Sequence, residues 1–590
     1  MNMLNSLKYY CPLKSLYMTN LIVIVIIFFL SFSSVFAETD ISEPLEIWSN
    51  DNDDKIEEAV IKYKETEEEA IQSLISQSNI TYSAYDTIGI YDQTNNGFNP
   101  TIWENSNFED VKYLIDQLSN HYQYNNISNF LDKTLLTIST PPNTNDILSQ
   151  SFLDLKMNYY VQSQNDNIVQ RILDQINQDD WSDYDLINYI NYHLVLSNYK
   201  KVCVKKYLNQ FKEKKTKLIY QTFCKAMSNN LPATDLLLSL LQEQGNADKE
   251  LIYILNAYIN GQEIDLKKIK LIDPLKLNLI DNKNIDFSDL ISIESNIGVK
   301  KYYALSDLSS TEKKINITEE LVRKNILKPD VLLVNYKAYL NDKNIFSSID
   351  YKSAKNDLEK RVFLFSQIRN SSDQKVLAKL ATNFMDEIRS GNMLYASNNL
   401  IYDKIKVIQP KKEYSKQAFD ICILLIMNNN NDRCREWGQL IKFNKDLILE
   451  YSLIEYYLLL NTNQPALSFS DELLNNIILS DQISELNKNI IVKYFQIKTN
   501  NKYANYWKSK SKLNKVSTIV PNIRLIEYLK NASNDNIGEA ALLILILNDD
   551  KKFSELDDFS IFAILEALNK IDPKTMKKLI FEISLKNIML

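Results

Sequence analysis

Few residues of this chain have the types and spacing that enzymatic chemistry needs. Histidine, the usual general base and the commonest zinc ligand, occurs only at His121 and His193, 72 positions apart. Two isolated histidines in unlike contexts argue against a histidine-dependent hydrolase and against a multi-histidine metal site. We interpret both as surface or boundary side chains, and we predict no catalytic, cofactor-binding or metal-binding residue.

The motifs that bind phosphates, metals or acyl groups are missing as well. The sequence contains no G-x-x-x-x-G-K-[ST], G-x-G-x-x-G, H-E-x-x-H, C-x-x-C or G-x-S-x-G pattern. It has only eight glycines in 590 residues, where average usage of about 7% would give roughly 40. A glycine-rich nucleotide-binding loop is therefore excluded, and we predict a protein that is not an enzyme and takes no cofactor.

One acidic residue leaves a cell-wall enzyme open as the alternative. Helical superhelices resemble the non-catalytic part of soluble lytic transglycosylases, whose catalytic glutamate belongs to a Glu-Ser motif and acts as general acid and base. Glu294-Ser295 is the nominal match, but the Gly-Leu-Met-Gln-type motif that should follow is absent. We interpret Glu294 as a helix-end carboxylate. A peptidoglycan enzyme or its regulatory subunit remains the alternative function.

The N-terminus has the order of a secretory signal: a positive stretch, an apolar run and small residues. Lys8 and Lys14 precede ten apolar residues over 21–30, and SFSSVFA follows and ends at Ala37. We expect residues 1–37 to be a signal peptide that is cleaved before Glu38, and the mature protein to be periplasmic.

A retained anchor is the alternative to cleavage. The apolar run is short of the ~20 residues that a spanning helix needs, and extending it over 21–36 brings in several serines. Inner-membrane anchoring through residues 21–36 is therefore the second reading of this segment. No later segment is predicted to span a membrane, because the most apolar one, 540–547, is short enough to be a buried helix.

The charge of the chain disfavours nucleic acid and anionic membranes as partners. Loss of residues 1–37 removes two lysines and no acidic residue, which changes the formal net charge from −8 to −10. The compact basic cluster KEKK at 212–215 is interpreted as a solvated turn.

Four cysteines would remain after cleavage, and their spacing suggests two local disulfides. The first pair is centred near Lys214 in a polar stretch, and the second is centred at Asn428 within MNNNN. Residues at equal distances from the turn of an antiparallel helical hairpin lie opposite each other, and export permits disulfide formation. The predicted structural bridges are Cys203–Cys224 and Cys422–Cys434.

The remaining pattern is helical. Apolar residues recur at helical spacing from residue 108 onward, the stretch 447–460 is apolar nearly all round, and Pro573 opens a last helix. Asn and Asp take the turn positions that glycine and proline usually occupy. We predict an all-α fold, a degenerate α-solenoid of antiparallel helical hairpins similar to TPR or HEAT arrays.

The predicted organisation has four parts. They are a signal peptide over 1–37, an acidic helix and irregular connector over 38–107, and helical-repeat regions over 108–350 and 351–590.

Three stretches resemble an uncharacterised family of exported helical proteins from alphaproteobacteria. They are GIYDQTNNGFNPTIW (89–103), FCKAMSNNLPATDLLLSLLQEQGNADKELIYILNAY (223–258) and IDPLKLNLI (272–280). The resemblance implies a helical fold and the periplasm, but no activity and no site residues. The expected function is a periplasmic scaffold or adaptor that binds a protein or cell-envelope partner, with no span left in the membrane after cleavage.

Overall fold

The computed structural model describes residues 84–122, 124–144, 151–245, 248–309, 311–342, 350–391, 393–462, 464–499, 523–548 and 556–586. The signal peptide, the Ala37–Glu38 cleavage site, the anchor alternative over 21–36 and the predicted acidic helix lie outside these residues. None of the helices in the described ranges combines the length and apolar character needed to cross a membrane.

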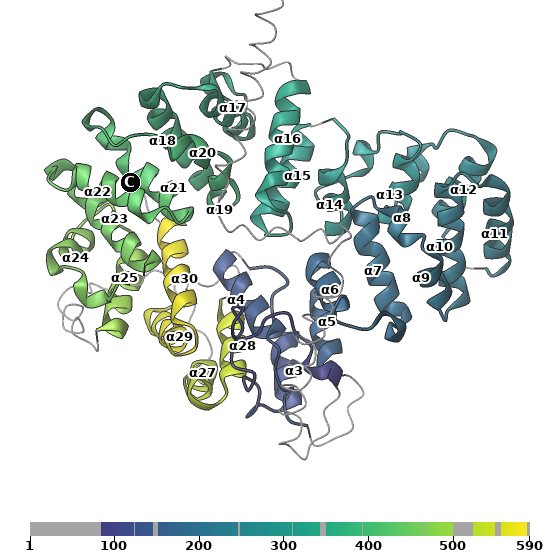
Figure 1. The fold of residues 1–590 in the computed structure, drawn as a ribbon, viewed down its shortest axis with the longest axis horizontal. Helices are drawn as coiled ribbons and strands as arrows, with labels where there is room; N and C mark the ends of the chain where they lie inside the picture. The colour runs from purple at the N-terminus through teal and green to yellow at the C-terminus, as the bar shows by residue number, and fades with distance from the viewer. Residues whose placement is uncertain are drawn as a thin grey trace, which may run out of the picture. The chain divides into compact units, whose positions relative to one another are not determined.

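Helices are the only extended regular elements in the described part of the chain, so the predicted all-α class is confirmed (Figure 1). The connector after Ala84 makes two isolated bridges, Tyr91 with Thr137 and Asn107 with Asn143. The α-helices up to residue 342 are α3 (Phe108–Asp116), α4 (Asn125–Leu136), α5 (Phe152–Gln162), α6 (Asp166–Leu173), α7 (Asp183–Val195), α8 (Tyr199–Val202), α9 (Lys205–Gln210), α10 (Lys214–Met227), α11 (Leu231–Glu243), α12 (Lys249–Asn260), α13 (Pro274–Asp281), α14 (Ile297–Leu305), α15 (Glu312–Arg323) and α16 (Pro329–Asp342).

The second half is built in the same way. Its α-helices are α17 (Asp357–Asn370), α18 (Gln374–Ser390), α19 (Leu394–Ser397), α20 (Tyr402–Ile405), α21 (Ala418–Met427), α22 (Asn431–Ile441), α23 (Ile448–Asn461), α24 (Asp471–Ile478), α25 (Glu485–Lys498), α27 (Ile523–Asp535), α28 (Ile537–Leu547), α29 (Asp558–Ile571) and α30 (Pro573–Lys586). Short 3₁₀ turns connect them: η1 (Ala84–Thr87), η2 (Gln178–Asp180), η3 (Leu266–Lys268), η4 (Ser288–Leu290), η5 (Tyr351–Ser353), η6 (Asn398–Leu400), η7 (Lys412–Gln417), η8 (Lys445–Leu447) and η9 (Ala466–Ser468).

One three-residue turn recurs between consecutive helices. It joins α5 to α6, α7 to α8, α10 to α11, and α21 to α22. Its middle residue lies in the left-handed region, with φ between 54° and 58°. Its last residue is always an asparagine, which is the N-cap of the next helix. The backbone N–H of this asparagine donates a hydrogen bond of 2.8–3.0 Å to the carbonyl oxygen five residues earlier.

This turn explains how the chain folds with so little glycine. The left-handed position after a helix usually belongs to glycine, and asparagine is the side chain that tolerates it best. In the described ranges seven residues other than glycine have positive φ, and five of them are asparagines. The predicted use of asparagine as the turn residue is therefore confirmed.

The apolar helices predicted to be central are buried. α23 buries nine of its residues, and α28 is covered on all sides between Gly538 and Leu545. Pro573 is the first residue of α30, as predicted.

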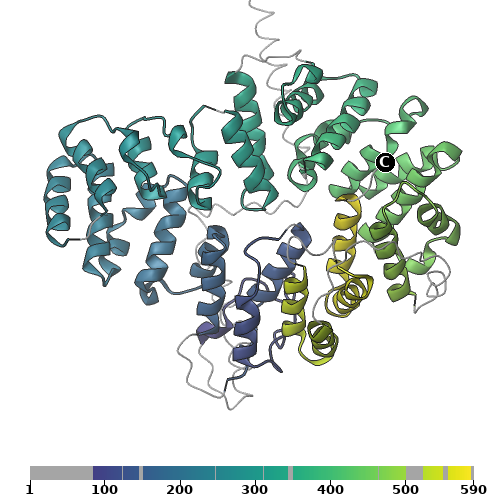
Figure 2. The same cartoon turned by 180° about the vertical axis from the view of Figure 1, so that it is seen from behind.

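The last helices pack against the first ones (Figures 1 and 2). α28 contacts α3 and α4, and α30 contacts α4 and α23. In an open solenoid each repeat contacts only its neighbours. These contacts join sequence-distant helices and are not contacts between neighbouring repeats, so the predicted solenoid arrangement stays a prediction.

Gly538 marks a close approach between these sequence-distant parts of the chain. Its N–H donates 3.0 Å to the carbonyl of Ile102, and a Cβ atom at this position would meet the indole of the buried Trp103 at 2.2 Å. No other residue type has room here, because any side chain would displace the tryptophan.

A carboxylate from the last helix caps α4. Tyr124 at the N-cap has no side-chain capping bond. Instead, the fully buried Glu582 accepts the N–H groups of Asn125 at 2.8 Å and Asn126 at 3.0 Å. Free N–H groups at a helix start need an acceptor, and a negative charge suits that end of the helix dipole. About two turns of α4 further along, Lys133 pairs with Asp572 at 2.8 Å.

A buried ion pair connects the helices on both sides of residues 343–349. The Arg361 guanidinium of α17 donates to both carboxylate oxygens of Glu319 of α15, at 3.0 and 2.6 Å. The Tyr336 hydroxyl donates to the same carboxylate at 2.6 Å. All three side chains are buried. The predicted boundary near residue 350 is therefore crossed by packing, and the division into two repeat regions stays a prediction.

Candidate functional site

Helix α11, which packs beside α10, leaves apolar surface uncovered. α11 begins with Asn230, whose side chain accepts the N–H of Ala233 at 3.3 Å, and it carries a proline in its first turn. Among its thirteen residues only Thr234, Leu238 and Leu241 are buried, because α11 packs chiefly on α10 and α12.

The uncovered leucines form a stripe along α11. Leu236 is 63% exposed and Leu240 is 42% exposed, and Ala233 and Leu237 beside them are half-buried. These four residues stand at helical spacing of three and four, so they share one face. Asp235, Ser239 and Gln242 are also exposed and form a polar face of α11 beside this stripe.

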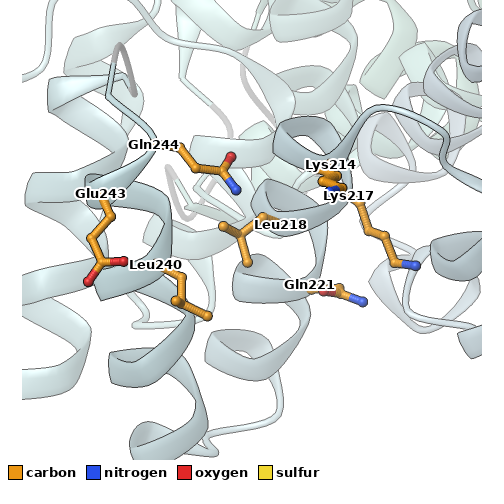
Figure 3. Close-up of a pocket in the computed structure, with 7 residues that line it drawn as sticks. All are labelled: Lys214, Lys217, Leu218, Gln221, Leu240, Glu243 and Gln244. Atoms are coloured by element: carbon orange, nitrogen blue, oxygen red, sulfur yellow. The ribbon is translucent and has the colours of Figure 1, made fainter.

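A groove of about 420 Å³ lies between this stripe and α10 (Figure 3). It is lined by Lys214, Lys217, Leu218 and Gln221 from α10 and by Leu240, Glu243 and Gln244 from α11. Figure 3 shows Leu218 directed into the space between the helices, while Lys217 and Glu243 extend on opposite sides. The groove thus has an apolar centre, a basic edge on α10 and an acid on the other edge.

The basic edge belongs to a helix without a single acidic residue. α10 contains Lys214, Lys215, Lys217 and Lys225, and three of these lysines are near its N-terminus. Positive charge at that end is unfavourable, because it adds to the positive end of the helix dipole. In the described part of the chain, no carboxylate pairs with Lys214 or Lys217. Their charge is therefore available to a bound molecule.

Both predicted cysteine pairs are brought together at disulfide-bond distance. Cys203 and Cys224 have Cα atoms 5.4 Å apart, and Cys422 and Cys434 have Cα atoms 4.7 Å apart. The second pair joins two consecutive helices around a turn at 428–430, as its spacing predicts.

The first pair needs a correction in its setting. Cys203 follows α8, and α9 lies between the two cysteines. Lys214 is the first residue of α10 and not the centre of a turn. The KEKK cluster, interpreted from sequence as a solvated turn, therefore supplies a residue to the groove.

Neither histidine lines the groove. His193 on α7 is buried. The centroid of its ring lies 4.5 Å from that of Tyr189 and 5.1 Å from that of Tyr192. Burial and then the charge of Lys201 lower the pKa of His193. His121 is half-buried, and burial followed by Lys324 lowers its pKa.

The carboxyl of Glu294, the one candidate acid of the sequence, does not line the groove either. Glu294 is exposed in a turn between η4 and α14. A general acid needs burial that favours its protonated form. Over the described ranges, no group of three or more His, Cys, Asp or Glu residues is placed to hold a metal ion.

Sequence reasoning missed the groove, although one feature pointed to it. α11 contains six leucines, at positions 231, 236, 237, 238, 240 and 241. One buried face of a thirteen-residue helix cannot hold all of them.

Comparison of the chain with protein-family models, curated proteins and solved structures finds no match.

Proposed function

We propose that this protein is an exported scaffold that binds another protein through the groove between α10 and α11. The observation that carries the proposal is the leucine stripe of α11 beside Lys214 and Lys217 of α10, which line the groove. A contiguous apolar strip with a polar rim is typical of protein-binding surfaces. A groove between two helices is also a common seat for a peptide helix.

The predicted compartment fits this role. Cysteine pairs at disulfide distance are compatible with an oxidising environment, and residues 1–37 have the order of an export signal. We therefore place the partner in the periplasm, together with the scaffold.

Site-specific photo-crosslinking in intact cells tests the proposal. A photoreactive amino acid replaces Leu240 in one variant and the neighbouring exposed Ser239, on the polar face of α11, in the control. We expect a discrete protein adduct from position 240 and none from position 239. The adduct should disappear when Leu236→Asp is added. Equal adducts from both positions, or none from position 240, would contradict binding through the groove.

A further inference from the structure

The partner presents an acidic amphipathic helix to the groove, and this inference rests on the proposed function. We infer that a helix of about three turns lies along α10 and α11. Its apolar residues contact the leucines of α11, and its Asp and Glu residues face the lysines of α10.

The length follows from the residues that share the α10 edge. Lys214, Lys217 and Gln221 line the groove, and the exposed Lys225 continues their row at helical spacing. The eleven steps from Lys214 to Lys225 span about 17 Å at a rise of 1.5 Å per residue. This length matches three turns of a bound helix, which would place apolar side chains at i, i+3 or i+4, and i+7 over the leucine stripe.

The charge of the partner follows from the contrast between this edge and the rest of the molecule. The chain has 75 acidic and 67 basic residues, yet α10 has four lysines and no acid. Carboxylates on the bound helix would pair with Lys214 and Lys217, which no described carboxylate neutralises. Glu243 on the opposite edge would form an ion pair with one lysine or arginine of the partner helix.

Two other occupants fit less well. A membrane surface binds residues that project from a convex face, whereas Leu218 and Leu240 line a concavity, and a net charge of −8 is repelled by anionic lipid. A second copy of the chain would bring the lysines of its own α10 against the same basic edge, where like charges repel each other. Both occupants remain outcomes of the experiment.

The experiment selects helices from an unbiased source. A displayed library of 15-residue helical peptides with randomised surface positions is panned on the full chain with its disulfides intact. Enriched peptides are then synthesised, and their affinities are measured by fluorescence anisotropy. We expect the enriched sequences to share an apolar i, i+4, i+7 pattern flanked by at least two acidic residues.

Matched variants identify the surface that binds. Leu240→Asp and the double variant Lys214→Glu/Lys217→Glu should each weaken binding at least tenfold. Val334→Asp and Lys337→Glu on α16 change an exposed apolar residue and an exposed lysine elsewhere, and they should leave the affinity unchanged. Circular dichroism confirms that each variant is folded.

The outcomes separate this inference from the proposed function. Enriched helices that depend on Leu240 but lack acidic residues overturn the acidic partner and leave protein binding intact. The same holds if no peptide is enriched while the crosslink from position 240 persists. Flotation of the chain with phospholipid vesicles that Leu240→Asp abolishes overturns both proposals. Self-association in sedimentation that Leu240→Asp abolishes identifies a second copy and overturns the partner helix.

Discussion

The helix pairs α10–α11 and α21–α22 share the same turn but differ in what covers them. The turn residues Asn229 and Asn429 have φ values of 56° and 58°, and the following N–H groups donate 2.9 and 2.8 Å to the carbonyls five residues earlier. Nevertheless, nine of the ten residues of α21 are buried, against three of thirteen in α11. α21 is packed by α18, α20, α22 and α23, whereas α11 has α10 and α12.

The difference teaches that local structure and burial are decided separately. Turn and helix formation depend on residues a few positions apart, and both pairs satisfy the same local rules. Burial depends on the helices that later parts of the chain bring alongside. The leucines of α11 stay uncovered because no described helix packs over them, and this is the surface that we propose for the partner.

The largest expected difference between the two regions concerns their leucines. Leu424→Ala in α21 should lower the free energy of unfolding by about 2–5 kcal/mol, because Leu424 is fully buried and its loss leaves a cavity. Leu236→Ala in α11 should change it by less than ~0.5 kcal/mol, since Leu236 is 63% exposed. Chemical denaturation of both variants measures the contrast, and equal losses would show that α11 is covered.

The disulfides come next. Replacement of either cysteine pair by alanine should cost about 3 kcal/mol by loop-closure entropy, since the bridges close 21 and 12 residues. Replacement of Cys422 and Cys434 should lower the free energy of unfolding more than replacement of the other pair, because both of these side chains are fully buried.

Non-reducing peptide mapping checks the connectivity on which this expectation rests. It should find Cys203 linked to Cys224 and Cys422 linked to Cys434. Four alkylatable thiols, or a peptide joining the first pair to the second, would refute the assignment.

Acidity should affect α21 in a way that α11 does not share. Burial raises the pKa of Asp420 above its ordinary value of 3.8, although Arg389 lies 2.8 Å away and opposes the shift. The carboxyl of Asp420 then keeps its proton in the folded chain at pH values where the same carboxyl in the unfolded chain has released it. Stability should therefore fall as the pH rises from 3.8 through the raised pKa, by at most about 1.4 kcal/mol per pH unit.

Denaturation at a series of pH values tests this dependence. Asp420→Asn should flatten it, whereas Glu243→Gln at the exposed edge of the groove should leave it unchanged. An identical pH profile in wild type and Asp420→Asn would remove Asp420 as its source.

The smallest effects should be the same in both regions, because the turn is the same. Glycine at Asn229 or Asn429 should change stability by less than ~0.5 kcal/mol, since glycine adopts positive φ freely. Valine at either position should cost about 1–2 kcal/mol. Thermal unfolding of the four variants measures this, and a large difference between the two sites would mean that one asparagine has a tertiary role.

Much of the secondary structure followed from the sequence alone. The helical period, the scarcity of glycine and the asparagines between apolar runs predicted helices joined by asparagine turns, and α23, α28 and the Pro573 start of α30 are where the pattern placed them. The Cys422–Cys434 hairpin was also predictable, because its two helices are consecutive and its turn is short.

The tertiary structure alone decided three other features. These are the packing of α28 on α3 and α4, the capping of Asn125 by Glu582, and the exposure of Leu236. The Glu582 contact joins residues 457 positions apart. No local sequence pattern predicts such a contact. The sequence of a helix start, of a glutamate or of a leucine stripe is the same whether or not a distant element covers it. Helices and turns are determined by neighbours within about five residues, whereas coverage is determined by packing that the whole chain must complete.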